Sequence, residues 1–426
     1  MRQNPERLAW TIVLVAFSVL CITLISTCLL VRWFILDSTV SLVVELSVSR
    51  NTVGVLVEGH AEETERATRR LKGRVTLTTD STSQALLTFR DPHSGAVLAT
   101  FTLFHDSVVT ISHTARPRFE TSAKPYTIEV VGKRGHGDVI IAADDENGRG
   151  LRFRVVTVYN AQIDMAQRGY YSVVLGGDYI GVTTRIGEAT LRYAGDKVAP
   201  VPLSYRGVVP GTDPAQPIEV SEAPFNLVYN SGFVLYEPMT GTPLLPAGWG
   251  CYNDQERLEE PRGETIRTTF EGRPVLHIRR GGERLNHAET GCRQLYSDMD
   301  LSAYSYLELR ASFYIASQSI STCGIKGSEC PLMLRIIYRD EAGELKEWIH
   351  GFYSTYNVSE WPLTCDTCRQ EHERINAGTW YVYESGNLAN ILPGEAKMQE
   401  LIEVRFYASG HAYEVMVDEV SLLAAP

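Results

Sequence analysis

The sequence predicts a mainly β protein with one N-terminal transmembrane helix and two exterior β domains. The apolar run Ala9–Val31 predicts the helix, and no later part of the 426 residues resembles it. Short segments rich in β-branched residues fill the rest of the chain, with turn-forming Gly, Pro, Asn and Asp between them. A Pro- and Gly-rich stretch, residues 207–226, predicts a linker between a domain at 38–206 and another at 227–426.

The apolar run, residues 9–31, holds no charged residue and is long enough to cross a bilayer core as one helix. Arg2, Arg7 and the free amine make the preceding tail, residues 1–8, positive, so we expect it in the cytoplasm and the bulk outside. A cleaved signal peptide is the alternative, but its apolar region would be shorter and would end in small residues. Here Arg32 and Trp33 follow, which favours an uncleaved signal-anchor in the cell membrane.

Composition excludes some partners. The net charge of −11 and the isoelectric point near 5.5 argue against nucleic acid, and against an anionic membrane surface, as the ligand. No nucleophile elbow, zinc-protease motif, phosphate-binding loop or dinucleotide fingerprint is present. We therefore expect a protein that is not an enzyme.

The sequence of the first exterior domain predicts mostly strands, such as Val75–Thr79 and Val97–Leu103. Only His60–Leu71 predicts a helix, because three glutamates precede three arginines at spacings that suit i,i+4 pairing and the helix dipole. The stretch Leu71–Asp91, with its Thr-rich step and Ser-x-Ala-x-Leu-x-Phe pattern, resembles the FecR family of bacterial envelope sensor domains. That resemblance implies a small β-solenoid or sandwich. The family's signalling members bind a sigma factor through a cytoplasmic segment, for which this tail is too short.

The last domain opens with Asn230–Phe233 and Pro246–Trp249 and closes with the strand Tyr413–Leu423. These stretches resemble galactose-binding-like jelly rolls, which include many carbohydrate-binding modules. The resemblance implies a β-sandwich that recognises a glycan or another component of the bacterial cell envelope. The alternative is a structural or signalling adaptor in which both exterior domains bind protein partners.

Six of the eight cysteines lie in this last domain, and an even set beyond a signal-anchor indicates disulfides in an oxidising compartment. Six cysteines allow fifteen pairings. Local closure favours Cys323 with Cys330 and Cys365 with Cys368, which leaves Cys251 for Cys292. Zinc bound by Cys323, Cys330, Cys365 and Cys368 is the competing interpretation.

Aromatic and polar side chains in the expected loops are the candidates for ligand contact, although core packing is the alternative for each tryptophan. Trp361 is the best candidate for exposure, and His287 has a structural, hydrogen-bonded role as its alternative. The jelly-roll resemblance also implies one structural Ca²⁺ held by Glu237 and Asp418, with a solvated Glu237 and an Asp418 in a turn or a salt bridge as the alternative. No other cofactor is expected. The ligand candidates are Trp361, Trp348, Tyr353, Trp380, Arg284 and His287.

Overall fold

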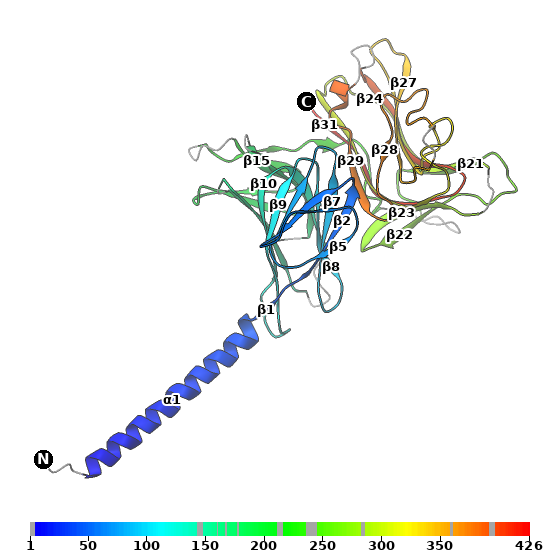
Figure 1. Ribbon diagram of the computed structural model, residues 1–426. Helices are drawn as coiled ribbons and strands as arrows, with labels where there is room; N and C mark the ends of the chain where they lie inside the picture. Colours follow the sequence, from blue (N-terminus) through cyan, green and yellow to red (C-terminus); the bar gives the residue numbers. More distant parts are fainter. Residues whose placement is uncertain are drawn as a thin grey trace.

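The chain folds into one long helix and four β-sheets, which confirms the predicted fold class. Figure 1 shows the helix projecting from the first of two β domains. The computed structural model describes residues 5–142, 148–159, 161–166, 168–176, 179–210, 216–235, 245–282, 286–357, 361–391 and 397–426.

The helix α1 spans Pro5–Asp37, and its apolar side chains are exposed. Its segment Leu8–Asp37 is long and apolar enough to cross a membrane, whether as an anchor or as a signal sequence. The strand β1 (Thr39–Val40) follows after a single residue, so the helix runs almost directly into the first domain.

The first domain packs two sheets face to face. Its core includes Phe89, Phe101 and Phe153, whose rings meet edge to face with centroids 5.7 and 5.9 Å apart. The parallel pair β10–β12 departs from the otherwise antiparallel pairing among its described strands. Sheet 1 has the order β17 (Lys197–Val201), β16 (Ala189–Tyr193), β13 (Ala161–Met165), β12 (Leu151–Thr157), β10 (Tyr126–Arg134), β9 (Val108–Pro117), β6 (Val75–Thr79), β3 (Val53–Val57) and β4 (Glu63–Glu65), and β1 pairs with β9. Sheet 2 has the order β19 (Glu219–Glu222), β18 (Tyr205–Pro210), β15 (Tyr179–Ile186), β14 (Gly169–Leu175), β11 (His136–Ile141), β8 (Val97–Leu103), β7 (Gln84–Arg90), β2 (Val43–Arg50) and β5 (Arg69–Leu71).

The second domain is a sandwich of two six-stranded sheets. Phe233, Trp249 and Phe406 pack together inside it, with ring centroids 5.1 to 5.6 Å apart. Sheet 3 has the order β22 (Glu264–Phe270), β23 (Arg273–Arg280), β31 (Tyr413–Ala425), β25 (Tyr306–Gln318) and β29 (Trp380–Glu384), and β20 (Phe225–Asn226) pairs with β31. Sheet 4 has the order β21 (Gly250–Gln255), β24 (Ala288–Asp300), β30 (Glu400–Gly410), β26 (Leu332–Arg339), β27 (Leu345–Tyr353) and β28 (Glu373–Arg374), and the short helix α2 is Leu388–Ile391.

Two local predictions are wrong. The expected helix His60–Leu71 contains β4 and β5, edge strands of two different sheets, and Arg69 still reaches Glu63 and Glu65. An exposed edge strand can carry the same charges as a surface helix, and tertiary pairing decides between them. The expected linker, residues 207–226, includes the end of β18 and all of β19 and β20. Among its described prolines, Pro210 ends β18, and Pro217 and Pro224 lie in connections, where a missing N–H is tolerated. Within it, residues 211–215 lie outside the described residues.

The two domains are packed together through the outer faces of sheets 2 and 3. Leu86 of β7 packs against Val275, Trp380 and Met416 of the second domain. The Gln84 amide donates to the Val382 carbonyl at 2.8 Å and accepts from its N–H at 2.9 Å. Figure 1 shows β29 beside β7 and β2 at this contact. This contact covers part of the outer face of sheet 3.

Candidate ligand-binding face

The candidate site is the outer face of sheet 4. Along β30, Val404 and Phe406 point into the sandwich core. Since side chains alternate along a strand, Glu403, Arg405 and Tyr407 point to the other face. The same alternation directs Arg293 of β24 and Arg335 of β26 to that face.

Three arginines lie in a row across this face. Arg293 stands directly opposite Arg405, and Arg405 stands directly opposite Arg335, on three neighbouring strands. We call this set the arginine row. Like charges directly opposite each other destabilise a sheet, so the row requires compensating charges.

Three glutamates supply that compensation. Glu403, almost fully buried, lies 2.5 Å from Arg405 and 3.7 Å from Arg293. Glu289 lies 3.3 Å from Arg405, and Glu347 lies 2.5 Å from Arg335. Burial alone would lower the pKa of Arg405, but Glu403 and the neighbouring acidic groups raise it. The face therefore presents fixed cations and anions in equal number.

The aromatic side chain of this face is Tyr252, which is half-buried on β21. The guanidinium carbons of Arg405 and Arg293 lie 5.3 and 5.9 Å from its ring centroid, which is cation–π distance. Its hydroxyl donates a short hydrogen bond to Glu289. Burial and the Glu289 charge raise the pKa of Tyr252, so its hydroxyl keeps its proton at neutral pH.

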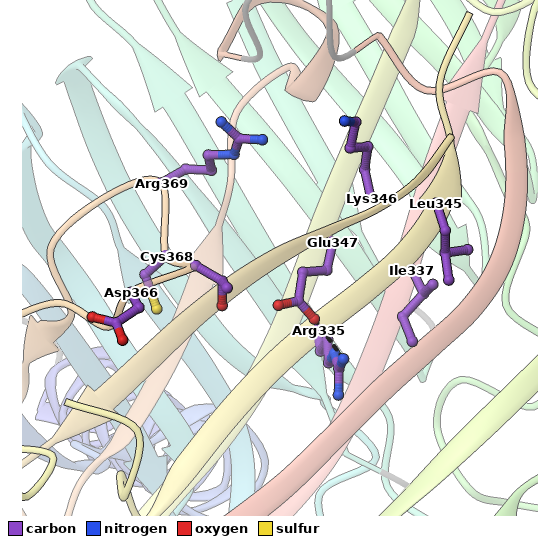
Figure 2. Close-up of a pocket in the computed structure, with 9 residues that line it drawn as sticks. Arg335, Ile337, Leu345, Lys346, Glu347, Asp366, Cys368 and Arg369 are labelled. Carbon is purple, nitrogen blue, oxygen red and sulfur yellow. Dashed lines mark ion pairs between the residues drawn. The ribbon is translucent and has the colours of Figure 1, made fainter. Parts of the chain in front are cut away.

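A pocket of about 500 Å³ adjoins the arginine row at Arg335. That volume lies within the range of small-ligand sites. Figure 2 shows Arg335 paired with Glu347 on the strands, and Asp366, Cys368 and Arg369 on a loop to one side of this pair. The pocket is thus formed by two strands of sheet 4 and one disulfide-closed loop.

The disulfide loops cover the middle of the same face. Cys323 is bonded to Cys330 and Cys365 to Cys368, while Cys251 is bonded to Cys292 across neighbouring strands. Beneath the two loops lies a small apolar cluster. It contains Met333, Ile349, Tyr353 and Tyr407.

Two groups of three ligand atoms, each made of one cysteine pair and His372, are close enough to hold a metal ion. The pairs are Cys323 with Cys330 and Cys365 with Cys368. Their chemistry does not fit one, because all four sulfurs are in disulfides. The His372 ring is also occupied. Its Nδ1 accepts from the Gly351 N–H at 2.9 Å, and its Nε2 donates to the Gly327 carbonyl at 2.7 Å. Burial lowers the pKa of His372 to about 4, consistent with a neutral structural histidine.

The structure contradicts three of the predicted ligand contacts. Trp348 is buried in the sandwich core because its position on β27 points inward. Tyr353 is buried beneath the disulfide loops. Trp380 is buried at the domain contact, where its indole N–H donates to Glu271 at 3.0 Å and its ring faces Arg273.

The other three residues predicted to contact a ligand differ in where they lie. Trp361 is half-buried beside the Cys365 loop. His287 pairs with Glu329 at 2.9 Å, and that hydrogen bond raises the pKa of His287. Arg284 lies outside the described residues.

The predicted calcium ligands do not come together among the described residues. Asp418 is buried and forms an ion pair with Arg273 at 2.9 Å, which is the alternative expected for it. Burial raises the pKa of Asp418, and the Arg273 charge opposes that rise. Glu237 lies outside the described residues, so the calcium site stays a prediction.

Sequence reasoning missed the arginine row. Its signal is a charged residue between two apolar residues inside a strand, as in Val404-Arg405-Phe406 and Leu334-Arg335-Ile336. Such a pattern marks a charge on the outer face of a half-buried sheet. The register that aligns three of these positions could not be deduced from one strand alone.

No family model and no curated protein matches this chain. Among solved structures, a putative anti-sigma factor from Parabacteroides distasonis is 16% identical, with a TM-score of 0.26, and the match covers 35% of this chain and 60% of the other. The family 11 carbohydrate-binding module of a cellulosomal cellulase of Clostridium thermocellum is 12% identical, with a TM-score of 0.27, covering 48% and 97%. A carbohydrate-binding module specific for non-crystalline cellulose is 14% identical, with a TM-score of 0.24, covering 46% and 93%. Scores this low do not establish a shared family.

Proposed function

We propose that this protein is a membrane-anchored extracytoplasmic binding protein whose sheet 4 holds an uncharged oligosaccharide. The observation that supports this most is the arginine row, in which each guanidinium is matched by a carboxylate next to a half-exposed tyrosine and a pocket. The proposed role is binding alone, with no catalysed reaction.

Paired arginines and glutamates suit sugar hydroxyls. A hydroxyl both donates and accepts hydrogen bonds, and guanidinium and carboxylate groups supply fixed donors and acceptors. Because the charges of Arg293, Arg335 and Arg405 are balanced by three glutamates, the face has no excess charge to favour an anion. The ring of Tyr252 adds an apolar surface of the kind that sugar C–H groups contact.

Catalysis fits this face poorly. A glycosidase needs one carboxyl group that keeps its proton and acts as the acid. Each glutamate of this set is instead ion-paired with an arginine, so its carboxylate oxygens are held by a guanidinium. We therefore place the protein among binding proteins.

We also propose that α1 is retained as the membrane anchor. Its last turns are part of the folded first domain, because the Phe34 ring packs on Phe119 and the Leu36 carbonyl accepts from Ser122 at 2.7 Å. Removal of the helix as a signal sequence within this region would break those contacts. The cytoplasmic position of residues 1–8 remains a prediction from charge alone.

A glycan array probed with the full chain in detergent tests the proposed ligand class. We expect binding to uncharged oligosaccharides, and a 10- to 100-fold weaker Kd for Arg293→Ala and Glu347→Gln, since a hydrogen bond to a charged group contributes about 1.5–3 kcal/mol. Arg279→Ala, which removes an exposed ion pair on sheet 3, is the matched control and should bind normally. Equal binding by all variants, or binding only to uronate-bearing glycans, would refute the proposal.

A protein ligand is the second candidate, favoured by one observation. Leu295, Ile325 and Leu345 are 63%, 70% and 60% exposed at the edges of this same face. Exposed apolar side chains that gather on one surface are a feature of protein-interaction sites. A blank array together with cross-linking of a partner to this face would favour the adaptor role over the glycan role.

A further inference from the structure

We propose that the loop Pro117–Lys124 of the first domain contacts the lipid headgroup layer of the bilayer that holds α1. This inference rests on the membrane anchor proposed above. The loop follows β9, whose end pairs with β1 immediately after the helix. Figure 1 shows α1 and β1 at the same end of the first domain.

The loop is fixed to the helix end by several contacts. The Arg118 N–H donates to the Ser38 carbonyl at 2.9 Å, and the Ser122 hydroxyl donates to the Leu36 carbonyl at 2.7 Å. The Lys124 ammonium pairs with Asp37 at 2.5 Å. The loop and the last turn of α1 therefore form one structural unit, so the depth of the helix sets the depth of the loop.

A buried ion pair holds the base of the loop. Arg116, which is almost fully buried, lies 2.7 Å from Asp91 and 2.5 Å from Glu120. The Tyr126 hydroxyl also donates to Asp91 at 2.6 Å. Burial alone would raise the pKa of Asp91, but the Tyr126 hydroxyl, the His93 N–H and Arg116 lower it, so the pair stays charged at neutral pH.

The depth of the loop follows from helix geometry. Phe34 stands three residues beyond Val31, the last apolar residue of the run, or about 4.5 Å along the axis. Each headgroup layer adds roughly 5–8 Å to the hydrocarbon core. The Phe119 ring centroid lies 5.3 Å from that of Phe34, edge to face, so both rings lie at headgroup depth.

The side chains at this level suit a lipid interface. Trp33 and Phe34 remain 58% and 45% exposed in the protein alone, and aromatic rings are enriched at membrane interfaces. Arg118 lies on the surface, with its guanidinium carbon 5.5 Å from the Phe34 ring centroid. Arg32, Arg118 and Lys124 outnumber Asp37 and Glu120 locally, although the whole chain is acidic. Lipid phosphates carry the opposite charge, and phosphate occurs even in zwitterionic lipids.

The contact would give the protein two points of attachment. A lone helix leaves the exterior domains free to tilt on the membrane. A loop that rests on the headgroups restricts that tilt and directs the second domain away from the surface.

Site-specific quenching tests the contact in the full-length protein in phosphatidylcholine vesicles. Cys21→Ser and Cys28→Ser remove the free thiols, and the six disulfide-bonded cysteines do not react with a maleimide. An environment-sensitive fluorophore is then attached through Phe119→Cys, or through Ala123→Cys in the same loop, which removes no ring. Glu344→Cys, in the exposed turn before β27, is the distant control. Native Cys21, with only Cys28 replaced, reports on the middle of the helix. Nitroxide lipids carry the quencher either in the headgroup or deep in the acyl chain.

We expect the deep quencher to act most strongly on position 21, and the headgroup quencher to act on positions 119 and 123 but not on 344. If position 21 is quenched while 119 and 123 behave like 344, the loop contact is wrong and the anchor stands. If position 21 is not quenched, the anchor itself is wrong and the loop contact is refuted with it.

Discussion

Arg310 connects the two exterior domains, and its removal gives the sharpest test of the packing between them. Its side chain is 1% exposed and is ion-paired with Asp138 of the first domain, itself 2% exposed, and with Glu384 of the second. Burial alone would raise the pKa of Glu384, but the Arg310 charge, with smaller contributions from His136 and Arg185, lowers it to about 2. Glu384 is therefore charged at neutral pH, and both carboxylates are paired with this guanidinium.

Arg310→Ala leaves two carboxylates in a dry contact without their cation. Breaking a buried ion pair costs about 3–5 kcal/mol. For domains of this size each kcal/mol shifts Tm by about 2–4 °C, so we expect a fall of about 6–20 °C. Scanning calorimetry of the full chain in detergent measures it, and the transition should split as the domains unfold separately.

Two comparisons make the result decisive. Arg279→Ala breaks an ion pair on the same sheet whose partners are 53% and 55% exposed, and exposed pairs contribute about 0–1 kcal/mol. Arg310→Met combined with Asp138→Asn removes one of the two buried charges that lack a partner. This double variant should recover part of the fall in Tm. If Arg310→Ala and Arg279→Ala shift Tm equally, the buried network does not hold the domains together.

Three further predictions concern the second domain. The free energy of unfolding should fall by about 3 kcal/mol as the pH drops from 6.5 to 4. The reason is that His372 gains a proton in the unfolded state, whereas in the folded state its pKa is about 4. Urea titrations at several pH values measure this dependence, and His372→Gln should make the free energy of unfolding depend less on pH. Replacing Cys251 and Cys292 with serine should cost about 4 kcal/mol for a loop of separation 41 in the chain-entropy model, and denaturant unfolding that changes by less than 1 kcal/mol would contradict it. Glu403→Gln removes the carboxylate between two arginines, so the glycan array should show new binding to uronate-bearing oligosaccharides; an unchanged neutral preference would count against the charge-balance argument.

The predictable parts of the fold were those set by local sequence. Strand periodicity and turn residues indicate the β architecture, because they depend on neighbours two to five positions apart. The segment His60–Leu71 shows the limit, since its charge spacing suits a helix but its pairing partners, β3 and β2, lie elsewhere in the chain. Trp348 shows the same limit for the site. Its aromatic ring is of the kind that contacts ligands, but the register of β27 directs it into the core. The arginine row needs the register of three strands at once, which no single segment contains.

The pocket and the domain contact share one segment of chain. Cys368 and Arg369 line the pocket, and a few residues later Glu373 pairs with Arg50 of β2 at 2.7 Å.

Asn376 continues this attachment. Its N–H donates to the Ser49 carbonyl at 2.9 Å, and its side-chain amide donates to the Val48 carbonyl at 2.8 Å. A ligand that displaces the Cys365 loop must therefore also strain contacts with the first domain, or leave that loop where it is. Because the first domain continues into α1 through β1, packed elements connect the proposed binding face to the proposed membrane anchor, and the orientation of that face follows that of the helix.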